Sequence, residues 1–212
     1  MVFADRRDAG RRLAAALGGL RDRRPIVIAV PRGGVVVGHE VATHLGAPLD
    51  VIVPRKLRAP FNPELAIGAV AEGGAVFIDE GIARGIEAVY VAQEIAAQRA
   101  EIVRRVHVYR GDRTIPPLEG RVAVVVDDGI ATGATMIAAL RAVRALAPSR
   151  LVAAVPVAPP DGIARLAREA DEMVCLVAPS VFHAVGQFYE NFAQVDDHEV
   201  TALLAERRAG IP

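Results

Sequence analysis

The sequence has one cysteine, no tryptophan and no excess of either charge. Cys175 alone cannot form an intrachain disulfide or a cysteine zinc cluster, and its place in the apolar run 173–177 predicts a buried structural thiol. Lysine plus arginine and aspartate plus glutamate number 25 each. No net electrostatic field therefore attracts nucleic acid or a membrane surface.

Long apolar runs are also missing. No stretch approaches the ~20 apolar residues of a membrane span. Charged residues at 5–8 stand where a signal peptide has its apolar core. We therefore expect a cytoplasmic protein with no membrane partner. At 212 residues, the chain is long enough for one domain with a full hydrophobic core.

Short apolar segments alternate with amphipathic segments along most of the chain, which predicts strands and helices in turn. The expected strands are 25–30, 49–53, 122–126, 151–155 and 173–177, and the expected helices are 5–17, 35–45, 87–107, 134–147, 161–169 and 196–208. Between the second and third of these strands we expect a basic loop at 54–64 and a hairpin formed by 66–71 and 75–78. This alternation is typical of an α/β fold with a mainly parallel, doubly wound sheet.

The most informative stretch is residues 122–135. Its apolar part predicts a strand buried on both faces, and that strand ends on two adjacent carboxylates, Asp127 and Asp128. Like charges side by side repel each other, so we expect sugar hydroxyls or a hydrated divalent cation to bind them. The residues behind them let backbone N–H groups approach a phosphate, and two threonine hydroxyls stand where a helix begins. These residues are Gly129, Ala131, Thr132, Gly133, Ala134 and Thr135.

Each piece of this run also occurs without a function, because Asp-Asp-Gly is a common turn and glycine loops follow many strands of α/β folds. The whole run offers acceptors for a diol and donors for a phosphate monoester. It resembles the phosphoribosyl-pyrophosphate signature of the type I phosphoribosyltransferases. That resemblance implies one domain over 1–212, with a core at about 20–180, a flexible flap at about 54–80, and a small hood from 179–192 and the N-terminal helix.

A second glycine loop, Val-Pro-Arg-Gly-Gly at 30–34, follows the first expected strand. Arg32 beside Gly33 and Gly34 suits a polyanion, although a simple turn would need no function. The loop is similar to the pyrophosphate loop of the same family, and particularly to the Ser-Arg-Gly-Gly loop of xanthine–guanine phosphoribosyltransferases. That likeness implies a cis peptide at Pro31–Arg32.

Arg55 and Lys56 follow the second expected strand. A solvated basic turn is one interpretation of this pair. The pair also resembles the Arg-Lys pair found there in adenine phosphoribosyltransferases, which implies a second clamp on the pyrophosphate beneath the flap. A closed flap would exclude water from the reacting sugar.

Aromatic residues gather in the segment 179–192. Phe182, Phe188 and Tyr189 are candidates for stacking on a planar acceptor base. The alternative is a small hydrophobic cluster beneath a loop, which needs no ligand.

The resemblance implies an enzyme that moves ribose 5-phosphate from phosphoribosyl pyrophosphate to a nitrogenous base and releases pyrophosphate, with Mg²⁺ as cofactor. Asp127 and Asp128 would hold the ribose hydroxyls, directly or through the metal. Arg32, with Arg55 and Lys56, would balance the charge of the leaving anion. The loop 131–135 would bind the 5-phosphate, and the family implies a homodimer.

The chain departs from part of this family at Ala131, where many 6-oxopurine enzymes carry an acid and adenine enzymes carry alanine. The residues do not identify the acceptor. One alternative is a regulatory protein of the same fold that binds phosphoribosyl pyrophosphate or a nucleotide without turnover; the neutral charge argues against an RNA partner. Another is a protein similar to phosphoribosyl-pyrophosphate synthase, against which the length of the chain argues.

Overall fold

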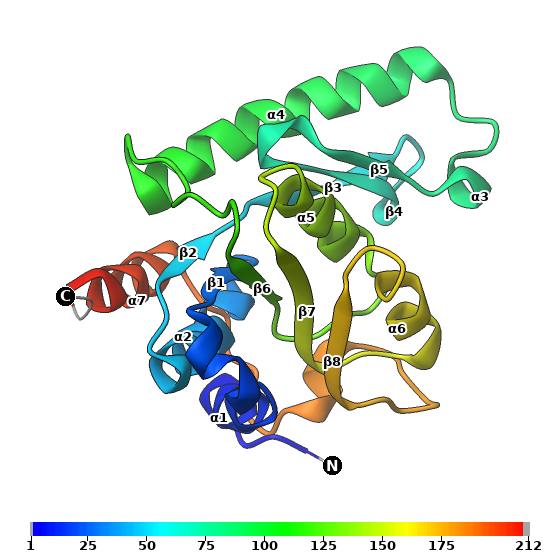
Figure 1. The fold of residues 1–212 in the computed structure, drawn as a ribbon. Coiled ribbons are helices and arrows are strands. Elements are labelled where there is room, and N and C mark those ends of the chain that lie inside the picture. Colours follow the sequence, from blue (N-terminus) through cyan, green and yellow to red (C-terminus); the bar gives the residue numbers. More distant parts are fainter. Residues whose placement is uncertain (1, 210–212) are drawn as a thin grey trace.

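The computed structural model describes residues 2–209 of the chain, and its centre is a five-stranded parallel sheet (Figure 1). The strand order is β2-β1-β6-β7-β8. The strands are β1 (Ile26–Ala29), β2 (Leu49–Val51), β6 (Val122–Val126), β7 (Arg150–Val157) and β8 (Glu172–Val177). The chain winds outward from β1 to β2 and then returns to β6 on the other side of β1. The carboxyl ends of β1 and β6 therefore form the switch point at which such sheets bind ligands.

Helices cover both faces of this sheet. One face packs against α1 (Arg6–Ala16), α2 (Gly33–Leu45) and α7 (Asp197–Ala209), and the other packs against α5 (Ala134–Arg144) and α6 (Pro160–Leu166). Successive side chains of β6 alternate between the two cores, with Val124 in the first and Val125 in the second. Covering both faces explains why the whole valine run is buried, and the predicted α/β fold with a doubly wound sheet is confirmed.

A second, antiparallel sheet of three strands lies beside the first, in the order β3-β4-β5. Its strands are β3 (Pro54–Ala59), β4 (Asn62–Ala71) and β5 (Val76–Ile78), with the short helix η2 (Glu72–Gly74) between the last two. The long helix α4 (Ala88–Arg110) runs along this sheet (Figure 1). The short helices η1 (Gly18–Arg23), α3 (Glu80–Ala83) and η3 (Val185–Phe188) complete the fold.

The expected hairpin between 66–71 and 75–78 is confirmed, but the basic loop expected at 54–64 is wrong. Residues 54–59 form β3, in which buried Leu57 stands between exposed Lys56 and Arg58. This is the ordinary alternation of a strand with one face in solvent, and its charged face concealed it in the sequence.

The expected flap at 54–80 is largely packed against the rest of the protein. Leu57, Ile67 and Val70 are fully buried in the same core as Ile102 of α4. The turn between β3 and β4 projects, with Phe61 97% exposed. That this segment moves as a flap stays a prediction. Its longest exposed stretch is residues 61–65, at the β3–β4 turn and the start of β4.

Two expectations from composition can be compared with the fold. Cys175 is half-buried and its Sγ lies 3.2 Å from the carbonyl oxygen of Val177, so the thiol is less enclosed than we expected. Burial raises the pKa of this thiol. Among residues 2–209, no helix is long and apolar enough to span a membrane.

A buried arginine ties the second sheet to the first. Arg110, at the end of α4, is 2% exposed. Its Nε lies 3.0 Å from Asp50 Oδ1 in β2, and its Nη2 donates to the carbonyl oxygen of Val51 at 2.6 Å and to Glu72 Oε2 at 3.1 Å. Arg110 thereby fixes the end of β2, from which the chain runs directly into β3.

Replacing this arginine tests how much of the fold depends on it. We expect Arg110→Ala to lower the free energy of unfolding by about 3–5 kcal/mol, because Asp50 and Glu72 would lose their buried partner. Arg150→Ala is the control, since its ion pair with Glu172 is exposed and is worth about 0–1 kcal/mol. Urea unfolding at neutral pH measures both, and equal losses would contradict the assignment.

Candidate functional site

The two glycine loops predicted from the sequence meet at the carboxyl ends of β1 and β6. A Cβ atom on Gly33 would lie 1.9 Å from Asp128 Oδ2, and one on Gly34 would lie 2.9 Å from Asp127 Cα. No side chain fits at such distances, so only glycine permits this close approach. The start of α2 therefore rests directly on the two acids.

The acids themselves are half-buried and differ in their surroundings. Asp127 Oδ1 accepts the backbone N–H of Asp128 at 2.8 Å. Burial, followed by the neighbouring charge of Asp128, raises the pKa of Asp127 well above its usual value. Asp128 Oδ2 accepts a hydrogen bond from Arg6 Nε at 2.7 Å, and its carbonyl oxygen accepts one from the Tyr189 hydroxyl. Among residues 2–209, Asp128 therefore has a cationic partner in Arg6, whereas Asp127 forms no ion pair.

Arg6 is a residue of this site that the sequence reasoning missed. It comes from α1, and its Nη1 donates to the carbonyl oxygen of Ala193 at 2.7 Å. Its guanidinium carbon lies 3.8 Å from the centre of the Phe192 ring. The N-terminal helix was expected in the hood, but the sequence singled out no residue of it. No motif near position 6 relates this residue to position 128.

The loop after the acids leads into α5 without a cap. Gly133 has φ +83°, and within the described residues no side chain caps the first turn of α5. The N–H groups at the start of this helix therefore remain available to an anion. Ala131 and Thr132 are exposed on this loop, while Thr135 is half-buried.

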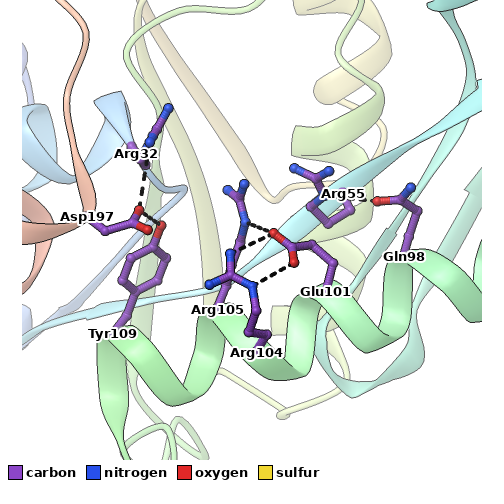
Figure 2. Close-up of polar contacts among 8 residues, drawn as sticks. All are labelled: Arg32, Arg55, Gln98, Glu101, Arg104, Arg105, Tyr109 and Asp197. Atoms are coloured by element: carbon purple, nitrogen blue, oxygen red, sulfur yellow. Dashed lines mark hydrogen bonds and ion pairs between the residues drawn. The ribbon is translucent and has the colours of Figure 1, made fainter.

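The peptide Pro31–Arg32 is cis, as the resemblance of the loop implied. The Arg32 side chain extends toward α7, where its Nη1 lies 3.9 Å from Asp197 Oδ1 (Figure 2). The same Asp197 oxygen accepts a 2.6 Å hydrogen bond from the Tyr109 hydroxyl of α4. Burial and this hydrogen bond raise the pKa of Tyr109 to about 12.

A basic cleft of about 290 Å³ lies between the two glycine loops and β3. It is lined by Pro31 of the first loop, Thr135 of the second, and Arg55 and Lys56 of β3. The structure thus brings these parts of three predicted motifs to one cavity. Further lining residues come from β3, the β3–β4 hairpin and α4: Pro54, Arg58, Pro63, Glu64 and Arg105.

The three aromatic residues proposed for stacking on a base pack together in one small cluster. Phe188 and Tyr189 are 9% and 6% exposed and belong to a small buried cluster with Phe3. Phe182 is half-buried beside Phe188, with ring centres 5.3 Å apart. This packing fits the alternative of a small hydrophobic cluster beneath a loop, and stacking of these rings on an acceptor base stays a prediction. Phe192, which is 37% exposed, is the ring that faces Arg6.

The chain is similar in sequence to known proteins. The family model described as phosphoribosyl transferase domain matches residues 5–193. In two strains, Mycobacterium tuberculosis has a protein provisionally named as a phosphoribosyl transferase, which is 48% identical over 205 residues. The match covers 96% of this chain and 46% of that protein, so the chain spans about half the length of these curated relatives.

A solved structure extends the likeness to three dimensions. The crystal structure of TT1426 from Thermus thermophilus is 47% identical in sequence, with a TM-score of 0.83. The match covers 97% of this chain and 99% of that one. From the domain match and these relatives, the chain belongs to the phosphoribosyl transferase family.

Proposed function

We propose that the protein transfers ribose 5-phosphate from phosphoribosyl pyrophosphate to a nitrogenous acceptor and releases pyrophosphate. The observation that carries this proposal is the meeting of two opposite environments at one edge of the sheet. Asp127 and Asp128 present carboxylate oxygens, while the start of α5 and the basic cleft present N–H groups and cations. A sugar bearing a phosphate at one end and a diphosphate at the other matches this arrangement.

Each part of the donor would then have a partner of suitable chemistry. The 5-phosphate would bind the N–H groups of residues 131–135 and the hydroxyls of Thr132 and Thr135. The ribose hydroxyls would bind the two acids. Arg55 and Lys56 would bind the diphosphate beside the loop of Gly33 and Gly34. Rate acceleration would come mainly from holding these groups in place and from balancing charge on the leaving anion.

Arg32 fits this scheme less directly than the sequence indicated. Its side chain extends to Asp197 and Tyr109, while Pro31 of the same loop lines the cleft. A role for Arg32 in binding the diphosphate would therefore require its side chain to leave Asp197. At 3.9 Å that ion pair is long, and both side chains are partly exposed, so little holds it.

The acids also fit a shared magnesium site. Within the described residues, no group of three or more histidine, cysteine, aspartate or glutamate side chains could hold a metal ion. Mg²⁺ is usually bound by one or two carboxylates with water and substrate phosphates, and Asp127 and Asp128 supply that number. When bound, the ion would neutralise charge on the diphosphate and make it a better leaving group. Arg6 would balance Asp128 while the donor is absent.

The residue at position 131 bears on which acceptor the protein uses. Ala131 stands where, by the resemblance to the family, many 6-oxopurine enzymes carry an acid that faces the purine. The loop 129–135 contains no aspartate or glutamate. A base that needs no carboxylate partner from this loop, or an amine, is therefore favoured over hypoxanthine and guanine.

The activity is tested by offering phosphoribosyl pyrophosphate and Mg²⁺ with a panel of bases and amines. We expect pyrophosphate to be released with one acceptor of the panel, and only when phosphoribosyl pyrophosphate and Mg²⁺ are both present. Tight donor binding without release for any acceptor would support the regulatory alternative. Absence of donor binding by the wild-type chain would contradict both functions.

Asp127→Asn separates ligand binding from stability. The variant keeps the Oδ1 acceptor but removes a charge, so we expect donor affinity to fall at least about tenfold. Since the folded pKa of Asp127 is raised, ionising it destabilises the folded state as the pH rises above the ordinary carboxyl range. The variant should therefore be more stable than wild type at neutral pH, with the difference vanishing in acid.

Asp171→Asn is the matched control. The pKa of Asp171 is lowered by its hydrogen bond with Arg144, so this substitution should reduce stability at neutral pH and leave donor affinity unchanged. Thermal unfolding across pH and calorimetric titration with donor measure both properties. A loss of donor affinity in Asp171→Asn equal to that in Asp127→Asn would contradict the assignment.

A further inference from the structure

The basic cleft is lined by an arginine that belongs neither to the two glycine loops nor to the pair Arg55 and Lys56. Arg105 comes from α4, yet it lines the same cleft as Arg55, Lys56 and Thr135. Arg58 of β3 adds a fourth cation, and Glu64 is the only acidic residue among those lining this cleft. The cleft therefore holds a local excess of positive charge in a chain with no net charge.

Arg105 rests on a carboxylate that has a second partner (Figure 2). Its Nε lies 2.8 Å from Glu101 Oε1. Arg104 binds both oxygens of the same carboxylate, with Nε 2.8 Å from Oε2 and Nη2 2.9 Å from Oε1. These two arginines lower the pKa of Glu101 to about 2. Because Arg104 holds the carboxylate at two points, Arg105 can leave Glu101 without stranding a charge.

Arg105 also repels its neighbour across the cleft. After burial, the charge of Arg105 is the largest cause that lowers the pKa of Arg55. The Nε of Arg55 is held by a neutral partner, Gln98 Oε1, at 3.0 Å. Gln98 is in turn oriented by Glu94, whose Oε1 accepts from its Nε2 at 3.0 Å. An anion placed between the two arginines would relieve this repulsion.

We propose that Arg105 is a diphosphate-binding residue of the cleft, held by Glu101 until the ligand arrives and then shared with Arg55 across the diphosphate. This inference rests on the proposed function, because it assigns the diphosphate end of the donor to this cleft. The forked guanidinium suits two phosphate oxygens, and its partial exposure leaves room to turn. In this arrangement α4 serves the site twice, by positioning Arg55 through Gln98 and by supplying Arg105.

The test compares Arg105→Gln with Arg104→Gln. Both remove one arginine from Glu101, but the Arg104 side chain is 56% exposed and does not line the cleft. Calorimetric titration with phosphoribosyl pyrophosphate, inorganic pyrophosphate and ribose 5-phosphate, each with Mg²⁺, measures the affinities. We expect Arg105→Gln to weaken the two diphosphate ligands about ten- to a hundredfold and to leave ribose 5-phosphate unchanged. Arg104→Gln should bind all three as wild type does.

Other outcomes overturn the inference in recognisable ways. Unchanged diphosphate affinity in Arg105→Gln would remove Arg105 from the site. If Arg105→Gln weakens ribose 5-phosphate as much as the diphosphate ligands, the residue only supports the structure. Arg105→Lys, which keeps the charge, should in that case not raise the affinity for the diphosphate ligands above that for ribose 5-phosphate. If Arg104→Gln weakens diphosphate binding as much as Arg105→Gln does, the cause is the overall positive charge of α4 and not a contact made by Arg105. If wild type binds none of the three ligands, the proposed function itself fails.

Discussion

The site depends on the close approach of the first glycine loop to the two acids. Gly33 and Gly34 let the start of α2 rest on Asp127 and Asp128, at distances that would not admit a single methyl group. This approach is possible because β1 and β6 are neighbours in the sheet and both end at the same edge. Two segments far apart in the chain thereby become two sides of one site.

Charge is distributed unevenly around that contact. The two acids lie side by side with Arg6 as the partner of one of them, so the pKa of Asp127 is raised by its burial and by its neighbour. Beyond the loop of Pro31, the basic cleft concentrates arginines that repel each other. A bound cation would reduce the repulsion between the two acids, and a bound anion would reduce that between the arginines. Shifted pKa values with such causes are typical of functional sites.

The second sheet and α4 bring the basic half of the site into place. Arg110 ties the end of β2 to α4 and η2, and β3 follows directly from that end with Arg55 and Lys56. Three side chains of α4 accept hydrogen bonds at this site. Gln98 accepts from the Arg55 side chain and Glu94 from the Arg58 backbone, both in β3, and Glu101 accepts from Arg105 of the same helix. A helix that the sequence presented only as amphipathic is therefore part of the site's framework.

Local patterns in the sequence determined the strand–helix alternation, the hairpin and both glycine loops, because apolar periodicity and turn residues act over a few neighbouring positions. They concealed β3, whose charged face resembled a loop, and they left open whether Phe188 and Tyr189 stack on a ligand or form the small buried cluster that the structure has. Only the tertiary structure brought Arg6 to Asp128, and Arg105 to Arg55. Such contacts join distant segments through the packing of helices on sheets, and no spacing along the chain encodes them.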